Sequence, residues 1–95
     1  MSVIDITRAH DLDLETVRER AEELAERLKE KVSIDYRWNG NRIEFERRGA
    51  SGHIDVTESE VRVFIELALL LRPLHGKVES KVHQYLDETL GTADG

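Results

Sequence analysis

The sequence contains no cysteine, which excludes disulfides, thiolate catalysis and cysteine-ligated metals and favours a reducing compartment. It also lacks long hydrophobic runs. Its longest unbroken apolar stretch, residues 67–71, is far shorter than the roughly 20 residues that a membrane-spanning helix needs. The first residues show neither the basic start nor the apolar core of a secretory signal. These absences predict a cytoplasmic protein without a membrane span.

A basic patch is missing as well. The net charge is −6, and acidic and basic residues are interspersed along the chain. Proteins that bind nucleic acids usually present a basic face, so no nucleic-acid partner is expected. The length of 95 residues predicts one domain over residues 1–95 with a modest core. We expect order over about residues 2–91 and a frayed tail at residues 92–95.

Hydrophobic spacing predicts two helices. Apolar residues recur at helical intervals over residues 13–32, where Asp13 can cap the first turn by accepting hydrogen bonds from free backbone amides. A second helix is predicted over residues 76–91, ending at Gly91. The apolar stripes are Leu14, Val17, Ala21, Leu24, Ala25, Leu28 and Val32 in the first helix and Val78, Val82, Tyr85, Leu86 and Leu90 in the second.

Alternating residues predict five strands. The first strand covers residues 3–7, with Ile4 and Ile6 on one side. Asn39-Gly40 between two alternating runs is a strong hairpin signal, because both residues tolerate positive φ. A two-residue loop at this point makes these pairs: Trp38 with Asn41, Tyr36 with Ile43, Ile34 with Phe45, Arg37 with Arg42, and Asp35 with Glu44.

The fourth and fifth strands follow. Gly49 and Gly52 read as a turn pair, after which Ile54 and Val56 face Phe45 and Ile43. Residues 57–60 then turn the chain so that Val56 meets Val61. The fifth strand is predicted to run to Leu71 and to be stopped by Pro73, since proline cannot donate to the ladder. Its inner face carries Val61, Val63, Ile65, Leu67, Leu69 and Leu71, and its outer face Arg62, Phe64, Glu66, Ala68, Leu70 and Arg72.

The order β-α-β-β-β-β-α predicts an α+β fold. Strands two to five form an antiparallel meander, and both helices pack on its apolar face because each has one stripe to bury. The fifth strand has length to spare, so the first strand is expected beside it, which gives the sheet order 2-3-4-5-1. The C-terminal helix would then lie across the concave side, as in a shortened helix-grip arrangement.

No catalytic, cofactor or metal site is predicted, and the protein is not expected to be an enzyme. Ser51, His53 and Asp55 share one face of the fourth strand and so invite comparison with a catalytic triad. Neighbouring same-face positions lie about 6.5–7 Å apart, and this face should be open to water, which argues against a triad. The remaining histidines, His10, His75 and His83, read as exposed polar residues without converging metal ligands.

Phe64, Ala68 and Leu70 point away from the predicted core and raise a separate question. Three explanations stay open. The sheet can curl, or the first strand and the chain ends can cover these residues. The residues can dock another copy of the chain or an apolar surface. A ligand cavity can lie beneath the helix, although so small a domain leaves little room for one.

Three stretches resemble one known family, the polyhydroxyalkanoic acid system proteins. They are "ITRAHDL", "YRWNGNRIEFERRGASGHI" and "LLLRPLHGKVE". The resemblance covers residue 2 to about residue 91. It implies a cytoplasmic accessory factor of bacterial polyhydroxyalkanoate granules, which are hydrophobic polyester bodies with an amphiphilic coat. It brings no catalytic residues with it.

The resemblance and the residues together favour a non-enzymatic accessory protein, associated with granules, that binds the polyester granule surface or a granule-associated protein. Weak contacts through few residues suggest amplification by a homodimer or a protein partner. The alternatives are a binder of acyl chains, with a cavity near Tyr36, Trp38 and Tyr85, a self-associating structural domain, and a hydrolase that uses Ser51, His53 and Asp55. The predicted interaction surface consists of Phe64, Ala68, Leu70, Arg72 and His75.

Overall fold

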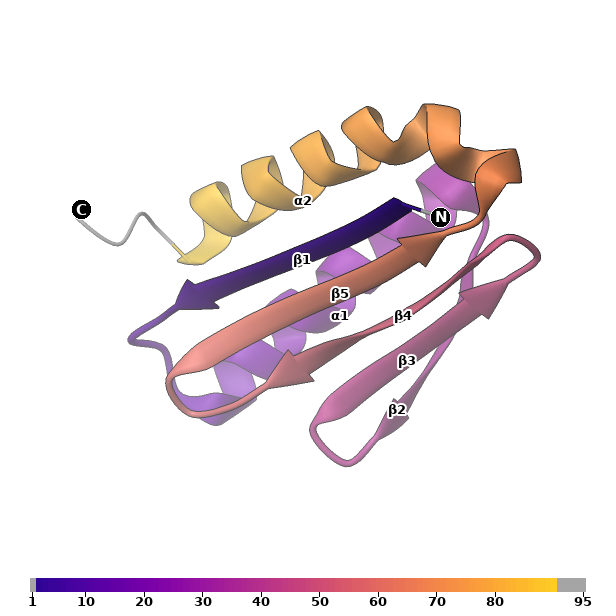
Figure 1. Ribbon diagram of the computed structural model, residues 1–95. Helices are drawn as coiled ribbons and strands as arrows, with labels where there is room; N and C mark the ends of the chain where they lie inside the picture. Colours follow the sequence, from indigo (N-terminus) through magenta and orange to yellow (C-terminus); the bar gives the residue numbers. More distant parts are fainter. Residues whose placement is uncertain (1, 91–95) are drawn as a thin grey trace.

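The computed structural model describes residues 2–90, and its elements follow the predicted order (Figure 1). The strands are β1 (Ser2–Ala9), β2 (Asp35–Asn39), β3 (Arg42–Arg47), β4 (Ala50–Val56) and β5 (Glu60–Leu67). The helices are α1 (Leu14–Val32), the short 3-10 helix η1 (Leu69–Leu74) and α2 (His75–Leu90). The predicted helix end at Gly91 and the predicted tail at residues 92–95 lie outside the described residues.

The strands form one antiparallel sheet in the order β1-β5-β4-β3-β2, which confirms the predicted α+β meander and the predicted place of the first strand. β1 pairs with β5 along its whole length, from Ser2 opposite Leu67 to Ala9 opposite Glu60. In Figure 1, α1 lies behind the sheet and α2 runs alongside β1. The first strand of the chain is therefore held by the last strand and the last helix.

The helices form where the sequence predicts them, for the predicted reasons. The carboxylate of Asp13 accepts a hydrogen bond of 2.7 Å from the backbone N–H of Thr16, which caps α1. Ser33, with φ of 56°, ends the helix in the left-handed conformation. Both apolar stripes pack into one core with the inner face of the sheet, except that Leu14 and Leu90 are only partly buried.

The β2–β3 hairpin differs from the prediction by two residues. Asn39 pairs with Arg42, so the turn consists of Gly40 and Asn41, and Gly40 adopts a φ of 64°. A shift of two keeps every side chain on its predicted face, because side chains alternate with a period of two. The inner pairs are Tyr36 with Phe45 and Trp38 with Ile43.

The shift has an electrostatic reason. The predicted register set Arg37 opposite Arg42 and Asp35 opposite Glu44, which are like charges. The observed register sets Arg37 opposite Glu44, and the two side chains form an ion pair of 3.5 Å. Opposite charges across a strand pair stabilise it by roughly 0.2–1 kcal/mol, whereas like charges destabilise it. Only Asp35 still faces an acid, Glu46.

The next hairpin is also shifted by two residues. Its turn consists of Arg48 and Gly49, and Gly52 lies inside β4 instead of in the turn. Gly52 is required there because a Cβ on it would lie 2.1 Å from the backbone oxygen of Phe64 and 2.9 Å from a ring carbon of Phe45. The observed pairs are Ile43 with Ile54 and Phe45 with Gly52, in place of Ile43 with Val56 and Phe45 with Ile54, while Val56 faces Val61 as predicted.

β5 is shorter than predicted. It ends at Leu67, and Pro73 lies within η1 instead of stopping the strand. The backbone N–H of Ala68 donates to the carbonyl oxygen of Gly49 at 2.8 Å, and the N–H of Leu71 donates back to the carbonyl of Ala68 at 2.9 Å. The chain therefore leaves the sheet at Ala68 and coils over the β3–β4 turn.

This early end changes which leucines are buried. In η1 the side chains no longer alternate between two faces, since the 3-10 helix has about three residues per turn. Leu71 packs into the core as predicted, but Leu69 is 72% exposed, so its predicted place in the core row is wrong. Leu70 is 66% exposed and belongs to this corner, not to the strand face that carries Phe64.

Candidate functional site

The outer face of the sheet, meaning the face away from α1 and α2, is covered by paired charges. Arg62 donates two hydrogen bonds to the carboxylate of Asp5, at 3.0 and 2.8 Å. Arg42 donates two to the carboxylate of Asp55, at 2.5 and 3.2 Å. The hydrogen bond from Arg62 lowers the pKa of Asp5 below its ordinary value. The charges of this face thus satisfy one another.

The three residues of the possible triad lie on this outer face, as predicted. The Nε2 atom of His53 is 3.4 Å from a carboxylate oxygen of Asp55, but both oxygens of Asp55 also bind Arg42. Within residues 2–90 no hydrogen bond joins Ser51 to His53. The ring of His53 instead stacks on Phe64, with centroids 5.3 Å apart. The arrangement resembles a cross-strand network more than a nucleophile and its base.

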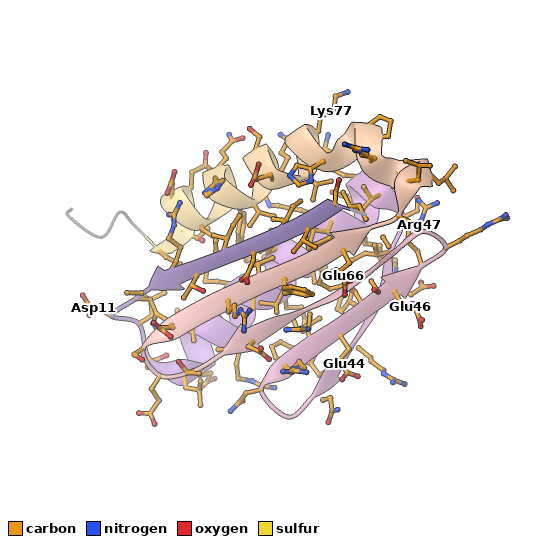
Figure 2. All side chains as sticks on the ribbon, viewed as in Figure 1. Asp11, Glu44, Glu46, Arg47, Glu66 and Lys77 are labelled. Carbon is orange, nitrogen blue, oxygen red and sulfur yellow. The ribbon has the colours of Figure 1, made fainter. Side chains whose placement is uncertain are left out.

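Phe64 belongs to the same network. It is half-buried between the ring of His53 and the guanidinium of Arg62, which lies 5.8 Å from its ring centroid. Neighbours on β4 and β5 therefore cover much of it, and not the first strand or the chain ends that the first explanation named. Figure 2 shows the same face, with Glu44 and Glu66 labelled.

The exposed apolar residues gather elsewhere, at the corner where the chain leaves the sheet. We call Ala68, Leu69 and Leu70 the corner patch. Leu70 lies beside the β3–β4 turn, since its Cδ2 would be 3.7 Å from a Cβ on Gly49. The exposed Arg72 follows along the chain, and Arg48 is exposed in that turn. The corner patch thus combines exposed leucines with nearby positive charge.

The predicted interaction surface is therefore divided among three places. Phe64 lies on the outer face, while Leu70 lies in the corner patch and Arg72 lies close to it in η1. His75 begins α2, one turn from Glu79, and its Nε2 is 3.6 Å from the Glu79 carboxylate. The helix predicted from residue 76 thus begins one residue earlier and contains both side chains.

One histidine is buried, contrary to the prediction. His10 is 8% exposed; its Nε2 lies 2.8 Å from the carbonyl oxygen of Thr57, and its Nδ1 accepts a hydrogen bond from the N–H of Leu12. It thus ties the end of β1 to the β4–β5 turn. His83, on α2, lies 3.0 Å from a guanidinium nitrogen of Arg8. Over the described part of the chain, no three histidine, aspartate or glutamate side chains gather to hold a metal ion.

The aromatic residues of the hypothetical acyl-chain cavity do not share a hollow. Trp38 lies beside α1, where its indole N–H donates to Glu22 at 2.6 Å and the Arg18 guanidinium lies 4.1 Å from its ring centroid. Tyr85 lies between the two helices and donates a hydrogen bond to the carboxylate of Glu23. Trp38 and Tyr85 border separate hollows.

The Tyr85–Glu23 hydrogen bond joins α1 to α2. Burial, and then the Glu23 carboxylate, raise the pKa of Tyr85 well above its ordinary value. The hydrogen bond from Tyr85 in turn lowers the pKa of Glu23. The guanidinium of Arg27 lies 4.8 Å from the centroid of the tyrosine ring. This contact fixes the two helices at one point along their length.

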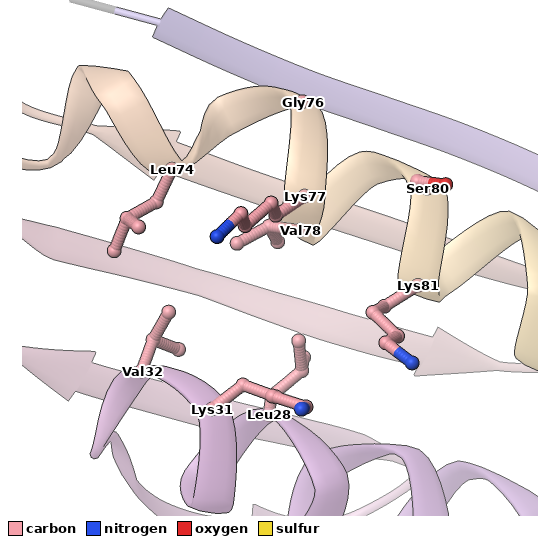
Figure 3. Close-up of a pocket in the computed structure, with 9 residues that line it drawn as sticks. All are labelled: Leu28, Lys31, Val32, Leu74, Gly76, Lys77, Val78, Ser80 and Lys81. Carbon is pink, nitrogen blue, oxygen red and sulfur yellow. The ribbon is translucent and has the colours of Figure 1, made fainter.

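Farther along, between the end of α1 and the start of α2, a groove of about 510 Å³ opens (Figure 3). Its walls are apolar side chains from both helices and η1, and its rim carries three lysines. We call it the lysine groove. It is lined by Leu28, Lys31, Val32, Leu74, Gly76, Lys77, Val78, Ser80 and Lys81.

Three of the four lysines of the protein line this one groove; the fourth is Lys29. No ion pair involves Lys31, Lys77 or Lys81 among residues 2–90. In an acidic protein, unpaired positive charges around an apolar hollow form a distinctive surface. Sequence analysis missed it because the groove depends on the packing of two helices far apart in the chain.

A comparison with family models finds a match over most of the chain. The family described as "Putative polyhydroxyalkanoic acid system protein" matches residues 4–90, which is nearly the whole chain and confirms the resemblance. No curated protein and no solved structure matches. In the described residues, no helix is long and apolar enough to cross a membrane.

Proposed function

Because the chain belongs to the family of polyhydroxyalkanoic acid system proteins, we propose that it is a non-enzymatic accessory protein of polyester storage granules. It attaches to the granule through the corner patch. The observation that carries this proposal is the exposure of Leu69 and Leu70, at 72% and 66%, side by side in a charged domain. Exposed adjacent apolar side chains are typical of surfaces that meet another apolar body.

Magnitudes favour attachment that is weak for one copy. Burying a leucine side chain fully contributes roughly 1.5–3 kcal/mol, and association costs at least several kcal/mol. Two leucines therefore give little net affinity in solution, but a granule offers many sites and several copies can bind together. Arg48 and Arg72, near the patch, can interact with acidic groups of the granule coat.

The test compares two double charge changes of equal size. Leu69→Asp with Leu70→Asp should leave the fold intact, because both side chains point into water, and should lower binding to isolated granules at least tenfold. The matched control is Val3→Asp with Ala9→Asp, two exposed positions on β1. The control should bind within about twofold of wild type in a granule sedimentation assay. Equal losses in both variants would contradict the proposal.

Beads of pure polyester separate the two candidate partners. Binding to beads and granules alike, lost in the Leu69/Leu70 variant, identifies the polymer surface as the partner. Binding to granules alone identifies a granule-associated protein. Light scattering of wild type and Leu70→Asp addresses self-association: a dimer that becomes a folded monomer would show that the corner patch joins two copies.

A further inference from the structure

The lysine groove has the two features that a fatty carboxylate needs. Leu74 and Val78 point toward Leu28 and Val32 across the gap between the helices (Figure 3). These side chains offer an apolar channel, and the lysines around it offer positive charge. Its volume of about 510 Å³ falls within the roughly 300–1,000 Å³ of typical small-ligand pockets.

We propose that the lysine groove binds a single acyl chain that ends in a carboxylate, such as a medium-chain fatty acid. The choice of ligand follows from charge. Lys31, Lys77 and Lys81 come from both walls, and none has a carboxylate partner within the described residues. A carboxylate among them gains charge-assisted hydrogen bonds, whereas a neutral or cationic head group does not.

The surroundings also indicate which way the ligand lies. Lys31 and Lys81, on opposite helices, border both the groove and a smaller hollow of about 100 Å³ that continues toward Tyr85. That hollow also carries Glu30 and Glu88 beside Arg27, so it offers a carboxylate less net positive charge than the groove does. The carboxylate therefore lies between Lys31 and Lys81, and the chain runs the other way, past Val78 to Leu74.

The polar contact that joins α1 to α2 lies away from the lysine groove. Tyr85 and Glu23 join α1 to α2 by a side-chain hydrogen bond farther along the pair. At the groove, residues 2–90 show no hydrogen bond or ion pair from one helix to the other. An acyl chain can occupy the space without breaking a polar contact of the protein.

The experiment is a titration of the full chain with decanoate, decanol and decyltrimethylammonium below their micelle concentrations, followed by calorimetry and amide chemical shifts. Decanoate should bind saturably and shift the amides of residues 28–32 and 74–81. The other two should bind at least tenfold more weakly. Equal binding of all three, or no saturable binding of decanoate, would overturn the proposal.

Lysine variants give the matched comparison. Lys31→Gln should weaken decanoate binding two- to fivefold, as expected for one partly exposed ion pair, and the triple variant of Lys31, Lys77 and Lys81 at least tenfold. Lys29→Gln removes the same charge from the same helix outside the groove and should change binding by less than twofold. Equal effects of Lys29→Gln and Lys31→Gln would show that only net charge matters, which overturns the site.

Two further measurements vary the length of the acyl chain and test the corner-patch variant. Affinity should rise by up to about fourfold per methylene and level off when the groove is filled. The variant with Leu69→Asp and Leu70→Asp should keep decanoate binding, and the lysine variants should keep granule attachment. The proposed acyl site and the proposed granule contact can therefore be refuted independently of each other. If the amide chemical shifts of the groove depend on protein concentration and not on decanoate, a second copy of the chain occupies the groove. The proposed ligand would then be wrong.

Discussion

The outer face of the sheet and the end where α1, η1 and α2 meet differ in how their polar and apolar groups are matched. On the outer face Asp5 pairs with Arg62, Asp55 with Arg42, and Phe64 with the ring of His53. At the end where α1, η1 and α2 meet, the lysines of the lysine groove have no carboxylate partners in the described residues. The leucines of the corner patch are exposed to solvent there.

This difference separates stability from binding. A face whose groups satisfy one another gains little from a new partner, because binding would first have to break existing contacts. Groups that have no partner within the protein break no contacts when they bind a complementary surface. In Figure 2, Arg47 and Lys77 lie toward one end of the molecule, where Glu46 also lies, and Asp11 lies at the other end. The outer face holds the sheet together, and the end that carries the lysine groove and the corner patch is free to bind.

The largest effect is expected from Gly52→Ala, which disrupts the sheet itself. The added methyl group would lie 2.1 Å from the backbone oxygen of Phe64, so β4 and β5 must separate. We expect a loss of roughly 2–4 kcal/mol in the free energy of unfolding, measured by urea denaturation. Gly76→Ala is the control, since an added Cβ there meets nothing within 4 Å. Equal stability of the two variants would contradict the conclusion that the sheet requires glycine at position 52.

A smaller effect is expected where the two helices are joined, from Tyr85→Phe. This change removes the hydrogen bond to Glu23, which is half-exposed, and should cost about 0.5–1.5 kcal/mol at neutral pH. Because the folded-state pKa of Glu23 is lowered, its contribution is present above the unfolded pKa and is lost as the pH falls through the folded pKa. The stabilities of wild type and Tyr85→Phe should therefore converge in acid. A constant difference between pH 7 and pH 3 would contradict this.

The smallest effect should come from one exposed pair on the outer face. Asp5→Asn removes the partner of Arg62 and should lower the urea midpoint slightly at pH 7. The lowered pKa of Asp5 means that this contribution, too, is present above the unfolded pKa and disappears in acid. Asp35→Asn is the control with the opposite sign, because Asp35 faces Glu46 and gains from losing its charge. A midpoint that falls equally in both would contradict the pairing.

Much of the fold could be predicted because it depends on local signals. Asp13 caps α1 through a contact three residues away, and the inward residues of every strand follow from alternation. Register could not be fixed in the same way. A shift of two residues leaves both faces unchanged, so only the energies of the cross-strand pairs decide it, and the attraction between Arg37 and Glu44 favours the observed register.

The candidate sites were harder to predict. Residues 67–71 are apolar throughout, so alternation could not show that the strand ends at Leu67 and that Leu69 turns outward. Lys77 and Lys81 stand one helical turn apart, which is a visible signal, but Lys31 joins them only through the packing of α1 against α2. The burial of His10 likewise depends on Thr57, 47 residues away.

The pairing of β1 with β5 also has a consequence for how the chain is made. β1 is synthesised before its partner β5, which follows roughly 50 residues later. At about 5–20 residues per second, Ile4 and Ile6 wait roughly 3–10 s before the strand that pairs with β1 emerges. The edge of the sheet can therefore form only after β5 has been synthesised. A nascent chain that stalls before residue 60 presents an apolar strand to the chaperones of the cell.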